Sequence, residues 1–192
     1  TAYEMLRSLV GSEMCIRDRC SIIAQPVGRK CVNVVDEIHI EGSARTLDAA
    51  EEFVRRYGHH RGEVLVYGDY AGNARSTRGD GTDFDIIASA YRPVFGPRLR
   101  MCNTYAAPPV FDSVQAVNAM LRNAAGEIRL KIHPRCAFTI RDLEQVSFTP
   151  GTRAIDKGDS GLTHHADALR YYIAAEWPVG GERLAPWTPR AG

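Results

Sequence analysis

The sequence predicts an α/β fold in which helices cover the faces of a mixed sheet. Three observations lead to this fold class. A short strand-like run, C-S-I-I-A-Q, and a longer run rich in Val and Ile flank a turn at Pro26–Arg29, as in an antiparallel hairpin. The stretch Glu63–Asp69 is almost continuously apolar, which is typical of a strand buried on both faces. Helical and strand-like segments then alternate, and 192 residues is a one-domain length.

In the N-terminal half, the two hairpin strands are expected over Cys20–Gln25 and Lys30–Ile40. A helix is expected over Arg45–Tyr57, because its apolar residues recur at helical spacing and Gly58 follows as a stop. The buried strand comes next. Asp69 therefore lies at its carboxyl end, where ligand groups gather in α/β sheets.

The C-terminal half begins after a loop rich in Gly, Ser and Arg at 70–81. A polar loop or hairpin is expected at 147–161, and a flexible tail at 179–192, which has Gly and Pro but no periodicity. The other expected elements are a helix from Thr82 or Asp83 to Tyr91, a strand over Arg98–Asn103, a helix from Asp112 or Ser113 to Arg122, a strand over Ile128–Ile132, a helix from about Cys136 to Gln145 and a final helix over His164–Trp177.

The composition is that of an ordinary globular domain, with 44% apolar and 24% charged residues. No apolar run approaches the ~20 residues of a membrane-spanning helix, so we expect a soluble protein without a membrane partner. The five cysteines are odd in number and lack C-x-x-C spacing. This disfavours a disulfide framework and a zinc finger, and it fits a reducing cytosol.

The net charge of +1 neither favours nor excludes a nucleic acid partner, so a DNA-binding face would need local clustering of basic side chains. Scattered solvated arginines are the simpler alternative. We take Arg75, Arg78 and Lys157 as candidate DNA-binding residues, since a lysine in the loop before the last helix could reach a phosphate. Other arginines that could contribute are Arg98, Arg100, Arg135, Arg141 and Arg153.

Two carboxylates are candidates for holding a divalent metal ion, because such hard cations prefer carboxylate oxygen. Asp69 follows the buried strand, although an Asp there can also cap the loop through backbone N–H groups. Asp167 lies near the apolar face of the last helix, and His164 precedes it by three residues, hence on the same side. Helix capping or a surface position is the alternative for this pair. His165 points elsewhere and is expected either to support the ligand residues from behind or to be structural.

The pair Asp36-Glu37 interrupts an apolar strand, so one of its side chains must point inward or toward a neighbouring strand. The pair is either a structural partner for an arginine or a supporting acid near the site. The sequence leaves both alternatives open.

The run Leu9–Arg19 resembles a translated transposase adapter of the kind used to prepare sequencing libraries, residue by residue. Such segments have to be excluded from reasoning about the fold. We therefore expect residues 1–19 to be an assembly artefact that is poorly packed or forms a helix without a core partner. The genuine domain is then expected to span residues 20–178.

Several segments together resemble the nuclease domain of the large terminase subunit of tailed bacteriophages. The similarity covers residues 20–178, and the combination of segments is more specific than any one of them. The segments are V-V-D-E-I at 34–38, Y-G-D-Y-A-G-N-A-R-S-T at 67–77, D-F-D-I-I at 83–87, V-N-A-M-L-R-N-A-A-G at 117–126, H-P-R-C at 133–136, R-D-L-E-Q-V at 141–146 and D-K-G-D-S-G-L-T-H-H-A-D-A-L-R-Y-Y-I at 156–173.

The resemblance implies a ribonuclease H-like fold and an endonuclease that cuts concatemeric viral DNA during genome packaging in the bacterial cytoplasm. It also implies two Mg²⁺ or Mn²⁺ ions. Asp69 matches the second acidic ligand, Asp167 the third, and His164 a histidine beside the last ligand in some members. The implied partners are double-stranded DNA and, in a full-length protein, an ATPase domain, the small terminase subunit and the portal.

The chain departs from the family at the first acidic ligand, which belongs on the first strand just before the segment that here begins at Cys20. The adapter-like residues Arg17-Asp18-Arg19 stand there instead, and Asp18 could replace the ligand only by accident. No Gly-rich phosphate loop of an ATPase occurs either. We therefore expect weak cleavage or none. The alternatives are another ribonuclease H-like nuclease, such as a resolvase or transposase core, and a non-catalytic interaction module.

Overall fold

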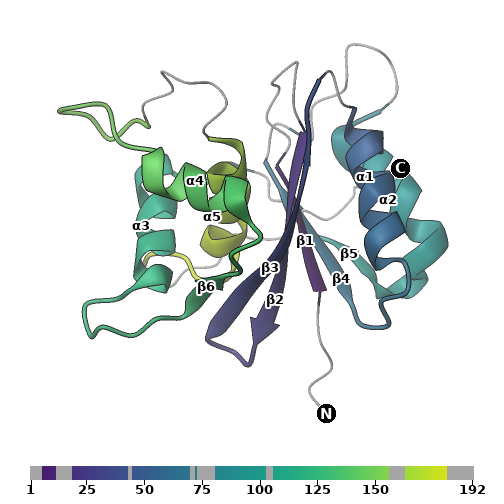
Figure 1. Ribbon diagram of the computed structural model, residues 1–192, viewed down its shortest axis with the longest axis horizontal. Helices are drawn as coiled ribbons and strands as arrows, with labels where there is room; N and C mark the ends of the chain where they lie inside the picture. Colours follow the sequence, from purple (N-terminus) through teal and green to yellow (C-terminus); the bar gives the residue numbers. More distant parts are fainter. Residues whose placement is uncertain are drawn as a thin grey trace.

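The computed structural model describes residues 6–11, 19–42, 45–69, 72, 81–102, 106–155 and 163–180. Its centre is a six-stranded sheet in the order β5-β4-β1-β2-β3-β6, with helices on both faces (Figure 1). Strand β2 is antiparallel to both of its neighbours, and all other neighbouring strands are parallel. The predicted fold class, a mixed sheet flanked by helices, is confirmed.

Strand β1 (Leu6–Gly11) lies in the middle of this sheet. It pairs in parallel with β4 (Val64–Gly68) and in antiparallel with β2 (Arg19–Val27). The expectation that residues 1–19 are poorly packed or form a helix without a core partner is therefore wrong for Leu6–Gly11, which form a strand paired on both sides. The physical reason is that strand pairing uses backbone N–H and C=O groups, which almost any sequence supplies, and the facing edges of β2 and β4 must be hydrogen-bonded.

The predicted hairpin is present and consists of β2 and β3 (Cys31–Ile40). Its turn contains Gly28 at φ +63°, a left-handed conformation that suits glycine. The two edge strands are short, and both run parallel to their neighbours. They are β5 (Leu99–Met101) beside β4 and β6 (Leu130–Ile132) beside β3.

Helices α1 (Thr46–Tyr57) and α2 (Asp83–Phe95) cover one face of the sheet (Figure 1). The core beneath them includes the fully buried rings of Phe53 and Tyr91, whose centroids lie 4.8 Å apart. The sequence predicted that α2 ends at Tyr91, and the helix contains Pro93. The helix instead continues for another turn, because Phe95 is buried in the same core and packing outweighs the local effect of the proline.

Helices α3 (Val110–Leu121), α4 (Ala137–Gln145) and α5 (His164–Glu176) cover the opposite face (Figure 1). Of these, α5 lies across β1, β2 and β4. The predicted polar loop or hairpin after α4 contains one antiparallel bridge, between Phe148 and Ile155. Residues 156–162 and 181–192 lie outside the described residues. None of the helices that the structure describes is long and apolar enough to cross a membrane.

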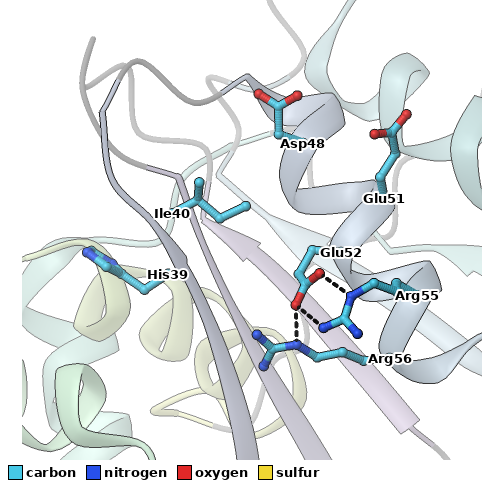
Figure 2. A pocket seen from close by; sticks show the side chains of 7 residues that line it. All are labelled: His39, Ile40, Asp48, Glu51, Glu52, Arg55 and Arg56. Atoms are coloured by element: carbon cyan, nitrogen blue, oxygen red, sulfur yellow. Dashed lines mark hydrogen bonds and ion pairs between the residues drawn. The ribbon is translucent and has the colours of Figure 1, made fainter.

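Charged side chains of α1 meet the end of β3 at an open pocket (Figure 2). Glu52 is central to them, because its carboxylate accepts hydrogen bonds of 2.6 Å from both the Arg55 Nε and the Arg56 Nε. Arg56 Nη1 also reaches Asp36 Oδ2 on β3 at 3.1 Å, and the Tyr57 hydroxyl donates to the same oxygen at 2.6 Å. Asp36 is thus the structural partner of an arginine, and these ion pairs tie α1 to the sheet.

The Glu52 ion pairs predict a measurable dependence of stability on pH. The hydrogen bond from Arg55 is the largest cause that lowers the pKa of Glu52, from 4.5 to about 2. Because the folded-state pKa is depressed, the stabilisation is complete above about pH 4.5 and is lost as the pH falls toward 2. Urea denaturation should show Glu52→Gln less stable than the parent by about 1 kcal/mol at neutral pH, with a difference that shrinks in acid.

The exposed neighbour Glu51 provides the control for this experiment. Glu51→Gln should change the free energy of unfolding by less than about 0.5 kcal/mol at any pH. A Glu52→Gln deficit that stayed constant, or grew, between neutral pH and about pH 3 would contradict the assigned ion pairs.

Candidate functional site

Asp69 is the first residue after β4, at the edge of the sheet where the parallel strands β1, β4 and β5 end. The end of β1 is next to it, since Val10 is paired with Gly68. The backbone oxygen of Asp69 accepts a hydrogen bond of 3.0 Å from Gly72 N, which starts the turn away from the sheet. The half-buried Asp69 therefore occupies the strand-end position that the sequence predicted for a ligand group.

Asp167 lies in the first turn of α5 and is 2% exposed. Its Oδ1 accepts a hydrogen bond of 2.6 Å from Arg170 Nε, one helical turn later on the same side. Both side chains are buried, and a buried carboxylate requires such a partner or a metal ion. The surface alternative for Asp167 is thereby excluded.

The guanidinium of Arg170 has further partners besides Asp167. Its Nη1 donates to Ser113 Oγ on α3 at 3.1 Å, and its Nη2 donates to the Tyr171 hydroxyl at 3.2 Å. Burial by itself would lower the pKa of Arg170, but the charges of Asp167 and, more weakly, Asp69 raise it above its ordinary value. Arg170 is thus a permanently charged cation in contact with Asp167, and the charge of Asp69 also acts on it.

Tyr171 links this cation to the strand end. Burial is the largest cause that raises the pKa of its phenol, and the charges of Asp69 and Asp167 and a hydrogen bond to Asp69 raise it further. The phenol therefore stays protonated and donates that hydrogen bond to Asp69. Asp69 from β4 and Asp167 from α5 consequently converge on the same Arg170–Tyr171 pair, although they are far apart in the sequence.

Packing of α5 against β4 brings the two aspartates together. The ring of Tyr67 on β4 lies 5.1 Å, centroid to centroid, from that of Tyr172 on α5. The Tyr67 hydroxyl donates to Glu176 Oε1 at 2.5 Å, near the C-terminal end of α5. Leu169 and Tyr172 are completely buried beneath the helix. The position of Asp167 relative to Asp69 therefore depends on the hydrophobic core.

The N-terminus of α5 is capped by a side chain from another helix, because its own N-cap residue, Thr163, makes no capping side-chain hydrogen bond. Asp142 on α4 is fully buried, and its Oδ2 accepts hydrogen bonds from His165 N at 2.9 Å and Ala166 N at 3.4 Å. Burial raises the pKa of the Asp142 carboxyl, and these two backbone donors oppose that effect. Asp142 thus satisfies donors that would otherwise be buried without an acceptor.

Helix α4 is capped in the same way, by Glu37 from β3. Its Oε1 accepts from Phe138 N at 2.9 Å, and its Oε2 accepts from Thr139 N at 2.9 Å and from Thr139 Oγ1 at 2.7 Å. Glu37 is therefore the inward-pointing member of the pair Asp36-Glu37. Both members therefore have structural partners: Asp36 is bonded to Arg56 and Tyr57, and Glu37 to the start of α4.

His165 lies between these two capping carboxylates and is 1% exposed. Its Nε2 is 4.0 Å from Glu37 Oε2, and its Nδ1 is 3.9 Å from Asp142 Oδ2. Burial is the main cause that lowers the pKa of His165, to about 3, so the ring is neutral near pH 7. Its ring is also stacked on that of Phe138, with centroids 5.6 Å apart. His165 therefore packs between the capping carboxylates and the Phe138 ring.

Adding His164 to Asp69 and Asp167 does not give a recognisable metal-binding cluster among the described residues. His164 is buried at the start of α5, but no three His, Cys, Asp or Glu side chains in the described part of the chain are grouped so that they could hold a metal ion. Strand β1 has the sequence L-R-S-L-V-G and carries no carboxylate. Arg75, Arg78, Lys157 and Asp18 lie outside the described residues.

Sequence reasoning missed the cation of the site and the acid that caps α5. The spacing of three residues between Asp167 and Arg170 was a usable signal, because residues at i and i+3 are neighbours on a helix. No comparable signal pointed to Asp142, Ser113 or Tyr171, since their contacts come from other elements or depend on how α5 packs.

No protein-family model and no curated protein matches the chain. Among solved structures, the chain is similar to the crystal structure of the g2p (large terminase) nuclease domain from bacteriophage SPP1 with bound Mn. The similarity covers 88% of this chain and 85% of that chain, with a TM-score of 0.53 and 14% sequence identity. The chain therefore shares its fold with this nuclease domain, in agreement with the fold that the sequence resemblance implied.

Proposed function

We propose that this chain is a metal-dependent endonuclease domain of the large terminase type, which cuts concatemeric viral DNA during genome packaging. The observation that carries the proposal is the convergence of Asp69 and Asp167 on the Arg170–Tyr171 pair at the strand ends. The SPP1 nuclease domain, which contains bound Mn, has the same fold and supports it.

Asp69 and Asp167 have the donor type that Mg²⁺ and Mn²⁺ prefer, and we assign them, with His164 one helical turn before Asp167, as the residues that would hold the ions. Two such ions, when bound, supply an activated water for in-line attack on a phosphodiester and stabilise the leaving oxygen. The described residues supply only part of the carboxylate ligands that two such ions would need, because β1 carries no Asp or Glu. We therefore propose that cleavage by this chain is weak or absent.

The partners follow from the same proposal. Arg75, Arg78 and Lys157 are proposed to contact the phosphates of double-stranded DNA. In a full-length protein, the domain would act with an ATPase domain, the small terminase subunit and the portal in the bacterial cytoplasm.

A non-catalytic interaction module is the second candidate. It is favoured by two observations: Arg170 already balances the charge of Asp167, and β1 carries no acid. Under this alternative, Asp69 and Asp167 serve as structural partners of Tyr171 and Arg170, and the chain binds no divalent ion.

Metal binding and plasmid cleavage together separate the two candidates. Calorimetric titration of the whole chain with Mn²⁺ should detect binding that Asp69→Asn and Asp167→Asn each weaken by about tenfold or more. Cleavage of supercoiled plasmid in Mn²⁺ should be slow, and Asp167→Asn should abolish it. Asp112→Asn, at an exposed carboxylate on α3, is the control and should leave both measurements unchanged.

Two other outcomes would change the assignment. Rapid Mn²⁺-dependent cleavage that Asp167→Asn abolishes would show that another acid completes the site. Absence of both binding and cleavage in the parent chain would favour the interaction module. Circular dichroism of each variant establishes that it is folded, since Asp167→Asn leaves Arg170 without its buried partner.

A further inference from the structure

Arg170 is a buried cation that is paired with Asp167, one of the two proposed metal ligands. It is 7% exposed and donates hydrogen bonds to Asp167 on its own helix, to Ser113 on α3 and to the Tyr171 hydroxyl. Its guanidinium carbon also lies 4.4 Å from the centre of the Tyr171 ring. Contacts on several sides hold the charged group at one place beside the aspartates.

We propose that Arg170 is a resident counter-ion of the site, which balances the aspartates in the metal-free protein and with which a divalent ion must compete for Asp167. This inference rests on the proposed function, because it concerns metal binding by the same carboxylates. It goes further by assigning a role to a residue that is not itself a metal ligand.

The first step of the argument is the charge balance of the metal-free site. Asp167 is 2% exposed, and an ionised carboxylate at that depth is strongly destabilising unless a cation pairs with it. The 2.6 Å contact with Arg170 Nε has the short length of a charge-assisted hydrogen bond. Asp69 contributes a second negative charge, held through Tyr171. Arg170 therefore gives Asp167, in direct contact, the positive charge that a metal ion would otherwise supply, and its hydrogen bond to the Tyr171 hydroxyl links it to Asp69.

The second step is the effect on metal binding. A divalent cation on Asp167 would lie close to a guanidinium that cannot lose its charge, and like charges repel strongly in a poorly solvated site. Ser113 and Tyr171 hold the guanidinium in place, so moving it away breaks their hydrogen bonds as well. Arg170 should therefore weaken metal binding while it stabilises the metal-free fold.

A purely positioning role for Arg170 predicts the opposite sign. If the guanidinium only oriented the Asp167 carboxylate toward a metal ion, then its removal would weaken metal binding. The direction of the change in Mn²⁺ affinity therefore distinguishes a competing cation from an orienting one.

The experiment measures the affinity for Mn²⁺ of four proteins that each comprise the whole chain: the parent and the single variants Arg170→Gln, Arg170→Lys and Arg141→Gln. Arg170→Gln should bind Mn²⁺ about tenfold more tightly than the parent. Its melting temperature without metal should fall by about 5 °C or more, and Mn²⁺ should restore much of this loss. Arg170→Lys keeps the charge and should stay within about threefold of the parent affinity.

Arg141→Gln is the matched control, because Arg141 is a partly exposed cation near Asp142 on the neighbouring helix. Its Mn²⁺ affinity should equal that of the parent. Equal or weaker binding by Arg170→Gln, with measurable binding by the parent, would overturn the inference and leave the proposed metal site standing. Absence of binding by the parent and by Arg170→Gln alike would overturn both.

A measurement on the parent chain keeps the inference testable if Arg170→Gln does not fold. The Arg170 Nε–H should give a slowly exchanging resonance in ¹⁵N-resolved NMR spectra without metal, since it is buried and bonded to Asp167. Diamagnetic Mg²⁺, at concentrations that shift the amides of Asp69 and Asp167, should accelerate this exchange by about tenfold or more. Exchange that stayed unchanged at saturating Mg²⁺ would show that the ion does not displace Arg170.

Discussion

Replacing Asp142 with alanine is expected to lower the free energy of unfolding by about 3 kcal/mol. The carboxylate is fully buried, and its removal leaves His165 N and Ala166 N enclosed without their acceptor. Alanine also leaves a cavity next to the neutral ring of His165. Urea denaturation at neutral pH measures this loss directly.

Two further variants sharpen the Asp142 experiment. Asp142→Asn has nearly the same size and keeps one oxygen acceptor. Its free energy of unfolding should therefore lie between those of the parent and of Asp142→Ala. Glu144→Ala removes an exposed carboxylate from the same helix and should cost less than about 0.5 kcal/mol. If Asp142→Ala cost no more than Glu144→Ala, then the assigned cap would be wrong.

The Asp142 cap also connects stability to the site. Glu37 on β3 caps α4, and Asp142 on α4 caps α5, the helix that carries Asp167. The two carboxylates thus fix the first turn of α5 relative to α4, and α4 relative to the sheet. In Asp142→Ala, hydrogen exchange at the amides of His165 and Ala166 should accelerate more than exchange at Leu169, because the helix loosens from its N-terminus.

Most of the fold could be predicted from hydrophobic periodicity. The stretch Glu63–Asp69 indicated a buried strand, and β4 occupies Val64–Gly68. The final helix was expected over His164–Trp177 and is found at His164–Glu176. These predictions succeed because the spacing of apolar residues reports directly which side of an element is buried. The position of Asp69 at a strand end followed from the same reasoning.

Long-range contacts could not be predicted in the same way. Rules for helix caps consider residues adjacent to the helix start, whereas α4 and α5 are capped by Glu37 and Asp142 from other elements. The helix at α2 was expected to end at Tyr91, but it continues to Phe95, whose burial depends on the tertiary structure. The resemblance of Leu9–Arg19 to a translated adapter carried no information about whether the backbone of Leu6–Gly11 pairs in the sheet.

Placing an aspartate on β1 is expected to raise Mn²⁺-dependent plasmid cleavage by about 100-fold over that of the parent chain. The strand lies directly beside β4, and its C-terminal half is paired with the residues that lead to Asp69. A carboxylate there would add the third negative charge that a pair of divalent ions requires. The increase should occur with Mn²⁺ or Mg²⁺ and not without a divalent ion.

The variants for this experiment are Ser8→Asp, Leu9→Asp and Val10→Asp, which are paired in turn with Val66, Tyr67 and Gly68. Successive side chains of a strand point to opposite faces of the sheet. Faster cleavage is therefore expected either for Leu9→Asp alone or for Ser8→Asp and Val10→Asp, but not for all three variants. The corresponding Asn variants have nearly the same size without the charge, and they should show no gain. Adding Asp167→Asn to the active variant should return cleavage to the parent level.

Because side chains of β1 alternate between the two faces of the sheet, both faster and unchanged cleavage would be informative. A gain at one set of positions would show that Asp69 and Asp167 lack only a third acid, and that the weak activity proposed for the parent has this cause. If all three variants fold, bind Mn²⁺ no better than the parent and cleave no faster, then the convergence of Asp69 and Asp167 on Arg170 is better explained as a structural ion-pair network.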